Sequence, residues 1–232
     1  MTDERGRIRH IAIRGTSTDL PLFPEEMELA QVSSLDSAGG PLSRFDWSNA
    51  SMRALDIKDV KLLEGRINSV RAETVSVKRV NVQSVEFTHC DLSSLRWTGG
   101  KISKTWFNDC KLLGARFDGT ILENLAFTDC KLDYSILSHI RSSGPVMFIR
   151  CSFREAEFDG CDFAHSLFEE CDLTLVNFGH GKYIGCDLRG NDLSAVNGAH
   201  NLKGVVLNYS QLTELAEALA TELDITFGNE GS

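Results

Sequence analysis

The sequence has no hydrophobic run that approaches the length of about 18 apolar residues needed to cross a membrane. Residues 1–15 carry arginine and aspartate where a secretory signal would need an apolar stretch. No CxxC pair, HExxH sequence, nucleophile elbow, phosphate-binding loop or dinucleotide fingerprint occurs. We therefore expect a cytoplasmic protein that does not bind membranes, and we predict no catalytic residue, metal site or cofactor.

Basic residues are outnumbered, with 24 lysines and arginines against 33 aspartates and glutamates. A general nucleic-acid binder needs an excess of basic residues to neutralise phosphates, so direct nucleic-acid binding is not expected. Residues 56–104 hold nine basic and six acidic side chains, whereas residues 150–195 hold four basic and nine acidic ones. The second half of the chain is therefore expected to carry the more negative surface.

A large apolar residue recurs at every fifth position from Phe87 to Leu137, and the same beat resumes one residue late at Phe148 and continues to Leu193. A smaller residue, often cysteine, stands two positions before many of these. A period of five fits neither a helix nor a plain strand, so the chain must bend repeatedly to bring both sets into one interior. Repetition at a short fixed period indicates a solenoid. The predicted core includes Phe87, Cys90, Leu92, Trp97, Phe107, Cys110, Phe117, Phe127, Cys130, Phe148, Cys151, Phe153, Phe158, Phe163, Phe168, Cys171 and Phe178.

The cysteine spacing predicts the length of one coil. Cys90, Cys110 and Cys130 are twenty residues apart, as are Cys151 and Cys171, which indicates four five-residue units per coil and one column of inward thiols. The step from Cys130 to Cys151 is twenty-one residues, so we predict a one-residue irregularity near 143–145, either a simple kink or a functional ledge. In such a column cysteine acts as a small apolar residue rather than as a metal or redox ligand.

These units resemble the pentapeptide-repeat family, whose pattern is a small residue, Asp or Asn, then Leu or Phe, then two variable positions. The clearest matches are Cys-Asp-Leu at 90–92, 171–173 and 186–188 and Cys-Asp-Phe at 161–163. The resemblance covers residues 42–207 and implies an all-β solenoid, a right-handed, four-sided β-helix. At the strand spacing of about 4.8 Å, some eight coils would make a rod on the order of 40 Å long.

The first units depart from the pattern, so less regular pairing is expected there. The departing positions are Lys61, Arg66, Arg71 and Ser76, where Asp or Asn is usual.

Both ends of a β-helix expose backbone groups and need caps. Residues 1–40 are predicted to cap the first coil as a lid, or else to pack along one side, with a short strand at Arg7–Ile13 and a weak helix between residues 20 and 32 that begins near Pro24. In that strand Ile8, Ile11 and Ile13 are available for burial. The repeat region occupies 41–208, and a frayed tail is expected at 228–232.

A C-terminal helix is predicted over 209–227, with Ser210 as its N-cap. Its leucines recur at helical spacing and are expected to cover the last coil. They are Leu212, Leu215, Leu219 and Leu223. Whether they also join two protomers is left open by their spacing, although the resemblance to Qnr- and MfpA-type members implies association through the C-terminal ends.

The acidic residues of the second half divide into two groups. Those at the Asp position of the repeat are expected to bond the backbone of their turns, namely Asp162, Asp172, Asp187 and Asp192. Others lie on surface positions, where a rigid ladder could line up their charges as a duplex lines up phosphates. We predict a partner-binding acidic face made of Glu155, Glu157, Asp159, Glu169 and Glu170, with a merely solvated surface as the alternative.

The resemblance implies a non-enzymatic interaction protein, because Qnr- and MfpA-type members mimic DNA and occupy the DNA-binding saddle of DNA gyrase or topoisomerase IV. The basic excess of residues 56–104 opposes such binding. The alternative is a scaffold or regulatory module with another protein partner, and an enzyme that uses an external groove is a third, weaker hypothesis.

Overall fold

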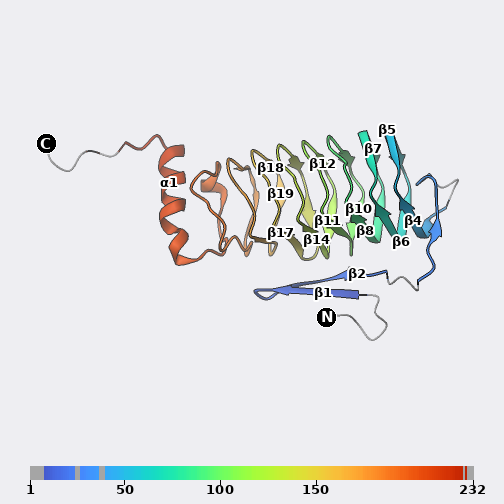
Figure 1. The fold of residues 1–232 in the computed structure, drawn as a ribbon. Coiled ribbons are helices and arrows are strands. Elements are labelled where there is room, and N and C mark those ends of the chain that lie inside the picture. Colours follow the sequence, from blue (N-terminus) through green and yellow to red (C-terminus); the bar gives the residue numbers. More distant parts are fainter. Residues whose placement is uncertain (1–7, 24–26, 37–39, 227, 229–232) are drawn as a thin grey trace.

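The computed structural model describes residues 8–23, 27–36, 40–226 and 228, which form a rod of stacked coils with a helix at one end (Figure 1). Each coil pairs in parallel with the next at a spacing of about twenty residues, so that Phe107 pairs with Phe87 on one side and Phe127 on the other. The predicted β-solenoid with a single C-terminal helix is confirmed. In the described part of the chain, no helix has the length and apolar character needed to cross a bilayer.

In the first coils each strand is long and turns a corner of the rod, so that it covers two sides. These strands are β4 (Leu42–Ser48), β5 (Ser51–Lys58), β6 (Lys61–Asn68), β7 (Arg71–Lys78) and β8 (Asn81–Thr88). The expectation of less regular pairing here was wrong, since β6 and β8 pair along almost their whole length. Valine-rich strands favour an extended backbone. At the corners Glu64 and Ser84 adopt positive φ, so the chain turns there without an Asp side chain to hold the turn.

From residue 96 onwards the strands are short and each covers one side. They are β9 (Arg96–Thr98), β10 (Lys101–Ser103), β11 (Trp106–Asn108), β12 (Arg116–Asp118), β13 (Ile121–Glu123), β14 (Leu125–Thr128), β15 (Ile136–Ser138), β16 (Arg141–Ser142), β17 (Val146–Ile149), β18 (Glu157–Asp159), β19 (Cys161–Asp162), β20 (Leu167–Glu169), β21 (Asn177–Phe178) and β22 (Gly181–Lys182). The solenoid makes about 7 turns. The eighth coil that we expected continues only as turns and isolated bridges, such as Asp187 with Val206.

The strands define four sides. In the 13-stranded sheet, β8 turns a corner and continues into two sides, one through β11, β14, β17 and β20 and the other through β10, β13, β16, β19 and β22. A 7-stranded sheet, from β5 through β7, β9, β12, β15 and β18 to β21, forms the third side. On the fourth side the first residues of β5 and β7 pair with each other, and beyond them only isolated bridges connect the described coils, as between Asp91 and Lys111. Two residues therefore share a side only when their separation is close to a multiple of twenty.

The pairing register changes by one residue at 143–145. Leu122 pairs with Ser142, whereas Leu125 pairs with Val146. The extra residue is accommodated at Gly144, where a Cβ atom would come within 2.8 Å of the Asn124 side chain. Glycine therefore lets the wider turn lie close to the coil below.

The interior is filled by stacked side chains. Every position that the sequence assigned to the core is buried. The rings of Phe87, Phe107, Phe127, Phe148 and Phe168 stack at centroid distances of 4.5, 4.6, 5.1 and 4.7 Å, close to the rise per coil. An apolar cavity of about 20 Å³ lies near the first coils, lined by residues such as Leu35 and Trp97. It is too small for a substrate, so binding must use the outer surface.

The N-terminal segment has two parts. β1 (Ile8–Ile13) and β2 (Thr16–Pro21) form an antiparallel hairpin that lies along the rod (Figure 1), so this part takes the second of the two expected placements. β3 (Ala30–Gln31) pairs with the edge of β4, and Leu35 is buried in the core. The helix expected between residues 20 and 32 is wrong for the described residues 20–23 and 27–32, because Ala30 and Gln31 extend to pair with the rod.

The C-terminal segment comprises 3-10 helices η1 (Ala199–Asn201) and η2 (Tyr209–Gln211) and the helix α1 (Leu212–Glu222). The helix is shorter than the expected range of 209–227 and begins later than an N-cap at Ser210 would require. Asn208 caps η2 instead, through a capping box with Gln211. The expected frayed tail lies, apart from Gly228, outside the described residues.

Replacing Phe127 by Ala is expected to lower the free energy of unfolding by about 3 to 5 kcal/mol, because the cavity would interrupt the ring stack. Phe163→Ala should behave alike, since Phe163 is also fully buried. The measurement is denaturant unfolding, with Tyr134→Ala as control, because Tyr134 is 59% exposed and its loss should cost about 0.5 kcal/mol or less. A cost below about 1 kcal/mol for both phenylalanines would contradict their inward placement.

Candidate interaction surfaces

The five acidic residues predicted to form one face are placed on two sides of the rod. Glu157 and Asp159 belong to β18 of the 7-stranded sheet, and Glu155 lies at the corner before it; all three are exposed. Glu169 ends β20 of the 13-stranded sheet, and Glu170 follows it at a corner. The structure therefore brings three of the five together and separates the other two from them.

Basic side chains neutralise much of the remaining acidic surface. The Arg14 guanidinium lies 2.9 Å from the Glu169 carboxylate. Further ion pairs join Arg150 to Asp129 at 2.7 Å, Arg154 to Asp172 at 3.4 Å and Lys182 to Asp162 at 3.3 Å. Within the described ranges no ion pair reaches Glu155, Glu157 or Asp159. We call these three residues the acidic cluster.

The 7-stranded sheet also carries exposed basic residues towards its other end. They are Lys58, Lys78, Arg96 and Arg116. Arg96 and Arg116 pair on neighbouring strands, so their charges stand one coil apart. This sheet is therefore positive near the first coils and negative at β18, and the continuous negative face that DNA mimicry requires is not formed here.

The aspartates at the repeat position stabilise their own turns. Each side chain accepts a hydrogen bond from the backbone N–H two residues later, and the oxygen-to-nitrogen distances lie between 2.9 and 3.2 Å. The donors to Asp162, Asp172, Asp187 and Asp192 are Ala164, Thr174, Arg189 and Ser194. The N–H and hydroxyl of Ser194 lower the pKa of Asp192 below its usual value. These residues therefore stabilise the turns of the fold.

The hairpin covers one side of the rod, and the sequence analysis did not predict this contact. Trp106, Ala126, Met147 and Leu167 follow one another on β11, β14, β17 and β20 at outward positions. Leu20 of β2 packs on this stripe and is 1% exposed. The available signal was an apolar residue at an outward position in four successive coils, which predicts a covered side.

Polar contacts position the hairpin on this stripe. The Arg9 guanidinium lies 3.9 Å from the ring centroid of Trp106. At the hairpin tip, Arg14 donates a hydrogen bond of 2.7 Å to the carbonyl of Arg189. Ile11 and Ile13 of β1 face the rod, whereas Ile8 is 36% exposed, because residues an odd number apart on a strand point to opposite faces. The expected burial of Ile8 is therefore wrong.

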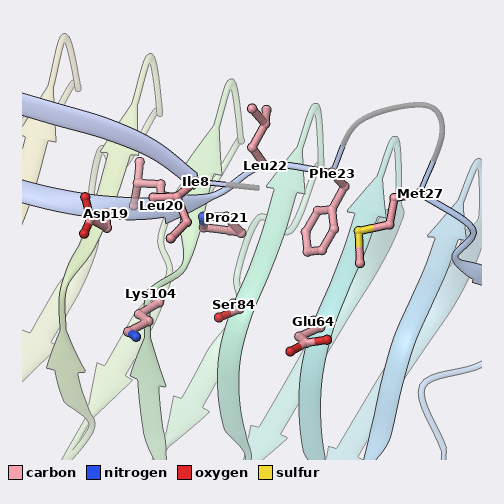
Figure 2. Close-up of a pocket in the computed structure, with 10 residues that line it drawn as sticks. All are labelled: Ile8, Asp19, Leu20, Pro21, Leu22, Phe23, Met27, Glu64, Ser84 and Lys104. Atoms are coloured by element: carbon pink, nitrogen blue, oxygen red, sulfur yellow. The ribbon is translucent and has the colours of Figure 1, made fainter. Parts of the chain in front are cut away.

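A cleft of about 220 Å³ separates the end of the hairpin from a corner of the rod. Figure 2 shows Leu20, Phe23 and Met27 on the hairpin side, and Glu64 and Lys104 on the rod side. Ser84 lies between the last two, one coil from each. The cleft is lined by both apolar and polar side chains. In the described part of the chain, no three His, Cys, Asp or Glu residues are placed to hold a metal ion.

The cysteines lie inside the rod. All seven are free and buried. Burial raises the pKa of Cys161 to about 12, so that its thiol stays protonated at neutral pH. A nucleophilic or metal-binding cysteine needs the thiolate, which this environment disfavours.

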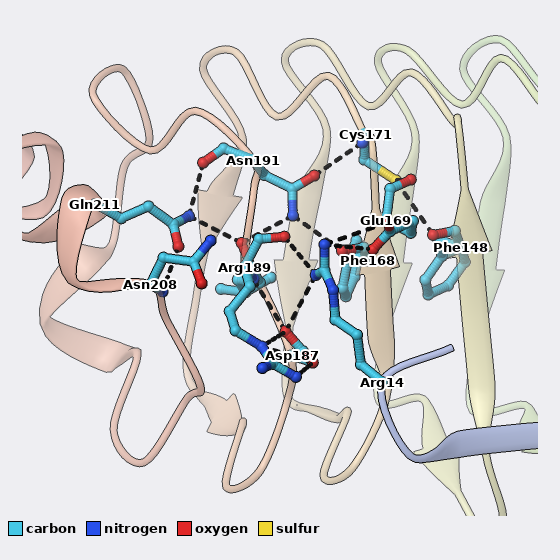
Figure 3. Close-up of polar contacts among 11 residues, drawn as sticks. Arg14, Phe148, Phe168, Glu169, Cys171, Asp187, Arg189, Asn191, Asn208 and Gln211 are labelled. Carbon is cyan, nitrogen blue, oxygen red and sulfur yellow. Dashed lines mark hydrogen bonds and ion pairs between the residues drawn. The ribbon is translucent and has the colours of Figure 1, made fainter. Parts of the chain in front are cut away.

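The column of cysteines ends in two amides (Figure 3). Asn191, twenty residues after Cys171, accepts a hydrogen bond of 2.8 Å from the Cys171 N–H and donates one of 2.9 Å to the carbonyl of Phe168. Gln211, twenty residues further on, donates to the carbonyls of Leu188 and Asn191 at 2.9 and 2.7 Å. These two residues satisfy the backbone of the last coils. The sequence held a signal for them, because both continue the spacing of the cysteine column.

The helix α1 closes the last coil with two carboxylates. Glu214 accepts a hydrogen bond of 3.0 Å from the N–H of Leu193. Glu222 accepts one of 2.5 Å from the N–H of Ala199 and pairs with His200 at 2.8 Å. Each carboxylate replaces a carbonyl that a further coil would supply, so the open end of the solenoid is capped by side chains.

The four helix leucines divide into two pairs. Leu215 and Leu219 are partly buried and pack on the core, as expected of a cap. Leu212 and Leu223 are 56% and 66% exposed, and Tyr209 and Ile225 beside the helix are 91% and 50% exposed. Only the second pair of leucines is available for contact with another molecule.

The coils, their four sides and their solid interior define a β-solenoid of five-residue units. Residues 101–178 match the family model described as a pentapeptide repeat region. This part of the rod is therefore a pentapeptide-repeat region.

Comparison with solved structures finds matches of low sequence identity. A trypsin-treated variant of QnrB1, described as a plasmid-mediated fluoroquinolone resistance protein, is 18% identical over 74% of this chain and 97% of that chain, with a TM-score of 0.40. HetL, described as a pentapeptide-repeat protein involved in heterocyst differentiation regulation from the cyanobacterium Nostoc sp. strain PCC 7120, is 14% identical over 75% and 89%, with a TM-score of 0.22. Comparison with curated protein sequences finds no match.

Acid is expected to weaken the C-terminal cap. Burial raises the pKa of Glu222, but hydrogen bonds from His200 and from the backbone N–H of Ala199 lower it more, so the pKa lies below the ordinary value of 4.5. The stabilisation is therefore complete above that value and is lost as the pH falls through the lower pKa of the folded protein. Melting temperatures measured across this acid range should fall more steeply for the natural protein than for Glu222→Gln.

The matched control is Glu217→Gln, on the exposed side of the same helix. Its melting temperature should follow that of the natural protein at every pH. If Glu222→Gln also did so, Glu222 would not be part of the cap.

Proposed function

We propose that the protein is a non-enzymatic interaction module that binds a protein partner on the outside of its rigid rod. The observation that carries this proposal is the acidic cluster: Glu157 and Asp159 lie on β18 and Glu155 at the corner before it, all without ion-pair partners among the described residues. Unpaired charges on a rigid surface give electrostatic specificity and fast association with a surface of opposite sign. The partner therefore presents a basic surface to β18.

This distribution of charge best fits a partner protein with a compact basic patch. This protein would then act as a scaffold or regulatory module for that partner. Three carboxylates on one side match a patch, whereas Lys58 and Arg96 on the same sheet would repel a long basic channel. The resemblance to Qnr- and MfpA-type proteins implies DNA gyrase or topoisomerase IV as the partner. These two enzymes are therefore the DNA-binding partners to test first. Binding of nucleic acid itself is not part of the proposal.

Reversing the acidic cluster by Glu157→Lys with Asp159→Lys is expected to weaken partner binding at least about tenfold, because two attractive contacts become repulsive. The readouts are inhibition of gyrase supercoiling, relief of quinolone poisoning, and recovery of the partner on immobilised protein. Glu170→Lys is the matched control, since Glu170 is exposed on another side and should leave binding unchanged.

Absence of any gyrase effect by the natural protein at micromolar concentration would remove DNA mimicry. Equal partner recovery by the natural protein and the double variant would remove the acidic cluster from the interface. If Glu170→Lys weakened binding as much as the double variant, more than one side of the rod would face the partner.

The resemblance also implies a homodimer joined at the C-terminal ends, and we propose that Leu212 and Leu223 would make this contact. Replacing both by Glu is expected to convert a C-terminal dimer to monomers in light scattering without loss of fold. Leu215→Glu with Leu219→Glu should instead lower the melting temperature, because these leucines pack on the core. An unchanged mass of the Leu212 and Leu223 variant would leave α1 as a cap alone.

A further inference from the structure

Among the residues that the structure describes, the first coil leaves one long strand edge without a pairing strand. β5 is the terminal strand of the 7-stranded sheet at the end of the rod opposite α1 (Figure 1), and among the described residues it pairs only with β7. β3 adds a layer elsewhere, on Phe45 and Asp46 of β4. In a strand, alternate residues direct their N–H and C=O groups to opposite neighbours, so half of this 8-residue strand presents unpaired backbone groups.

The side chains at this edge are only partly covered, by Leu35 from the segment before β4. Met52 and Leu55 are half-buried and pack on the core, whereas Ala72 and Val75, which pair with them on β7, are each 3% exposed. At the other end of the rod, Glu214 and Glu222 accept the backbone N–H groups of the last coil. Among the described residues no side chain accepts a hydrogen bond from the N–H groups of β5. One more antiparallel or parallel strand would both pair the backbone and bury these apolar groups.

We propose that this edge pairs with β5 of a second copy in antiparallel orientation, so that two rods meet head to head. The strand sequence is Ser-Met-Arg-Ala-Leu-Asp-Ile-Lys. When the two-fold axis passes between Ala54 and Leu55, Arg53 of each copy faces Asp56 of the other, and Met52 faces Ile57. Opposite charges and apolar residues that face each other across antiparallel strands stabilise the pair.

The charge pattern selects both the register and the occupant. A register shifted by two residues would place Arg53 opposite Lys58, where like charges repel. The favourable arrangement needs the same strand on both sides of the axis, which an unrelated peptide would not supply. β3 adds a layer near the corner diagonally across the coil, so the two rods would meet at an angle. This contact uses neither the acidic cluster nor α1 and is independent of the proposed function.

The test is sedimentation velocity over a series of protein concentrations, with Leu212→Glu and Leu223→Glu present throughout to remove any C-terminal association. We expect a dimer whose dissociation constant rises at least about tenfold in Arg53→Asp and in Asp56→Arg, because each change places like charges opposite each other twice. Combining Arg53→Asp with Asp56→Arg restores opposite charges and should restore the dimer. Glu73→Arg, one coil inside the edge, is the matched control and should not change the mass.

A cross-link provides a second measurement that does not depend on the charge variants. Ser51→Cys with Lys58→Cys would place each new thiol opposite one of the other copy, whereas the two positions in one chain stand at opposite ends of β5, beyond the reach of a disulfide. The seven natural cysteines are buried and free. Mild oxidation should therefore produce a covalent dimer, and Ser51→Cys alone should produce none.

Three results would overturn the proposal. They are a folded protein that remains a monomer at every concentration, a combined charge variant that stays as weak as the single ones, and equal cross-linking by the single-cysteine and double-cysteine variants.

Discussion

The structure depends on the hydrogen bonds that each coil makes to the next through its backbone. They hold the coils at the strand spacing of about 4.8 Å, which is also close to the stacking distance of aromatic rings. The phenylalanine column from Phe87 to Phe168 uses this agreement, since its rings stack at 4.5 to 5.1 Å. Because the same spacing suits backbone and core, side chains fill the interior apart from one small cavity near the first coils. The outer surface and the two ends are left for contact with other molecules.

The core and the coil length were predictable because both follow from periodicity along one chain. Phe127 and Cys130 are buried through their place in the five-residue beat, and the irregularity near Gly144 was visible as a spacing of twenty-one residues between two cysteines. The first strands were judged too irregular, because the absence of turn-forming Asp was given more weight than the β-branched residues of β7 and β8. Extended backbone there needs no side chain to hold a turn.

The grouping of surface residues was less predictable, because it depends on which unit of a coil each residue occupies. Glu157 and Glu169 are both acidic and near in sequence, but they are twelve residues apart, so they lie on different sheets. Arg14 pairs with Glu169 across more than 150 positions of the chain, and such contacts leave no periodic signal. The C-terminal cap was equally hard to predict. The hydrogen bond that Glu222 accepts from the Ala199 N–H requires the docking of a helix whose position the repeat does not specify.

The docking of the hairpin of β1 and β2 on the rod restricts the order in which the molecule can fold. Local contacts between neighbouring coils allow a solenoid to grow from its first strands as the chain is synthesised. The stripe under the hairpin, however, is complete only after β20 has formed, and the Arg14 bond also needs the carbonyl of Arg189. The hairpin precedes the rod in the chain but must wait for nearly the last coil before it can dock. Protection of the hairpin from proteolysis would therefore report that the whole rod has formed.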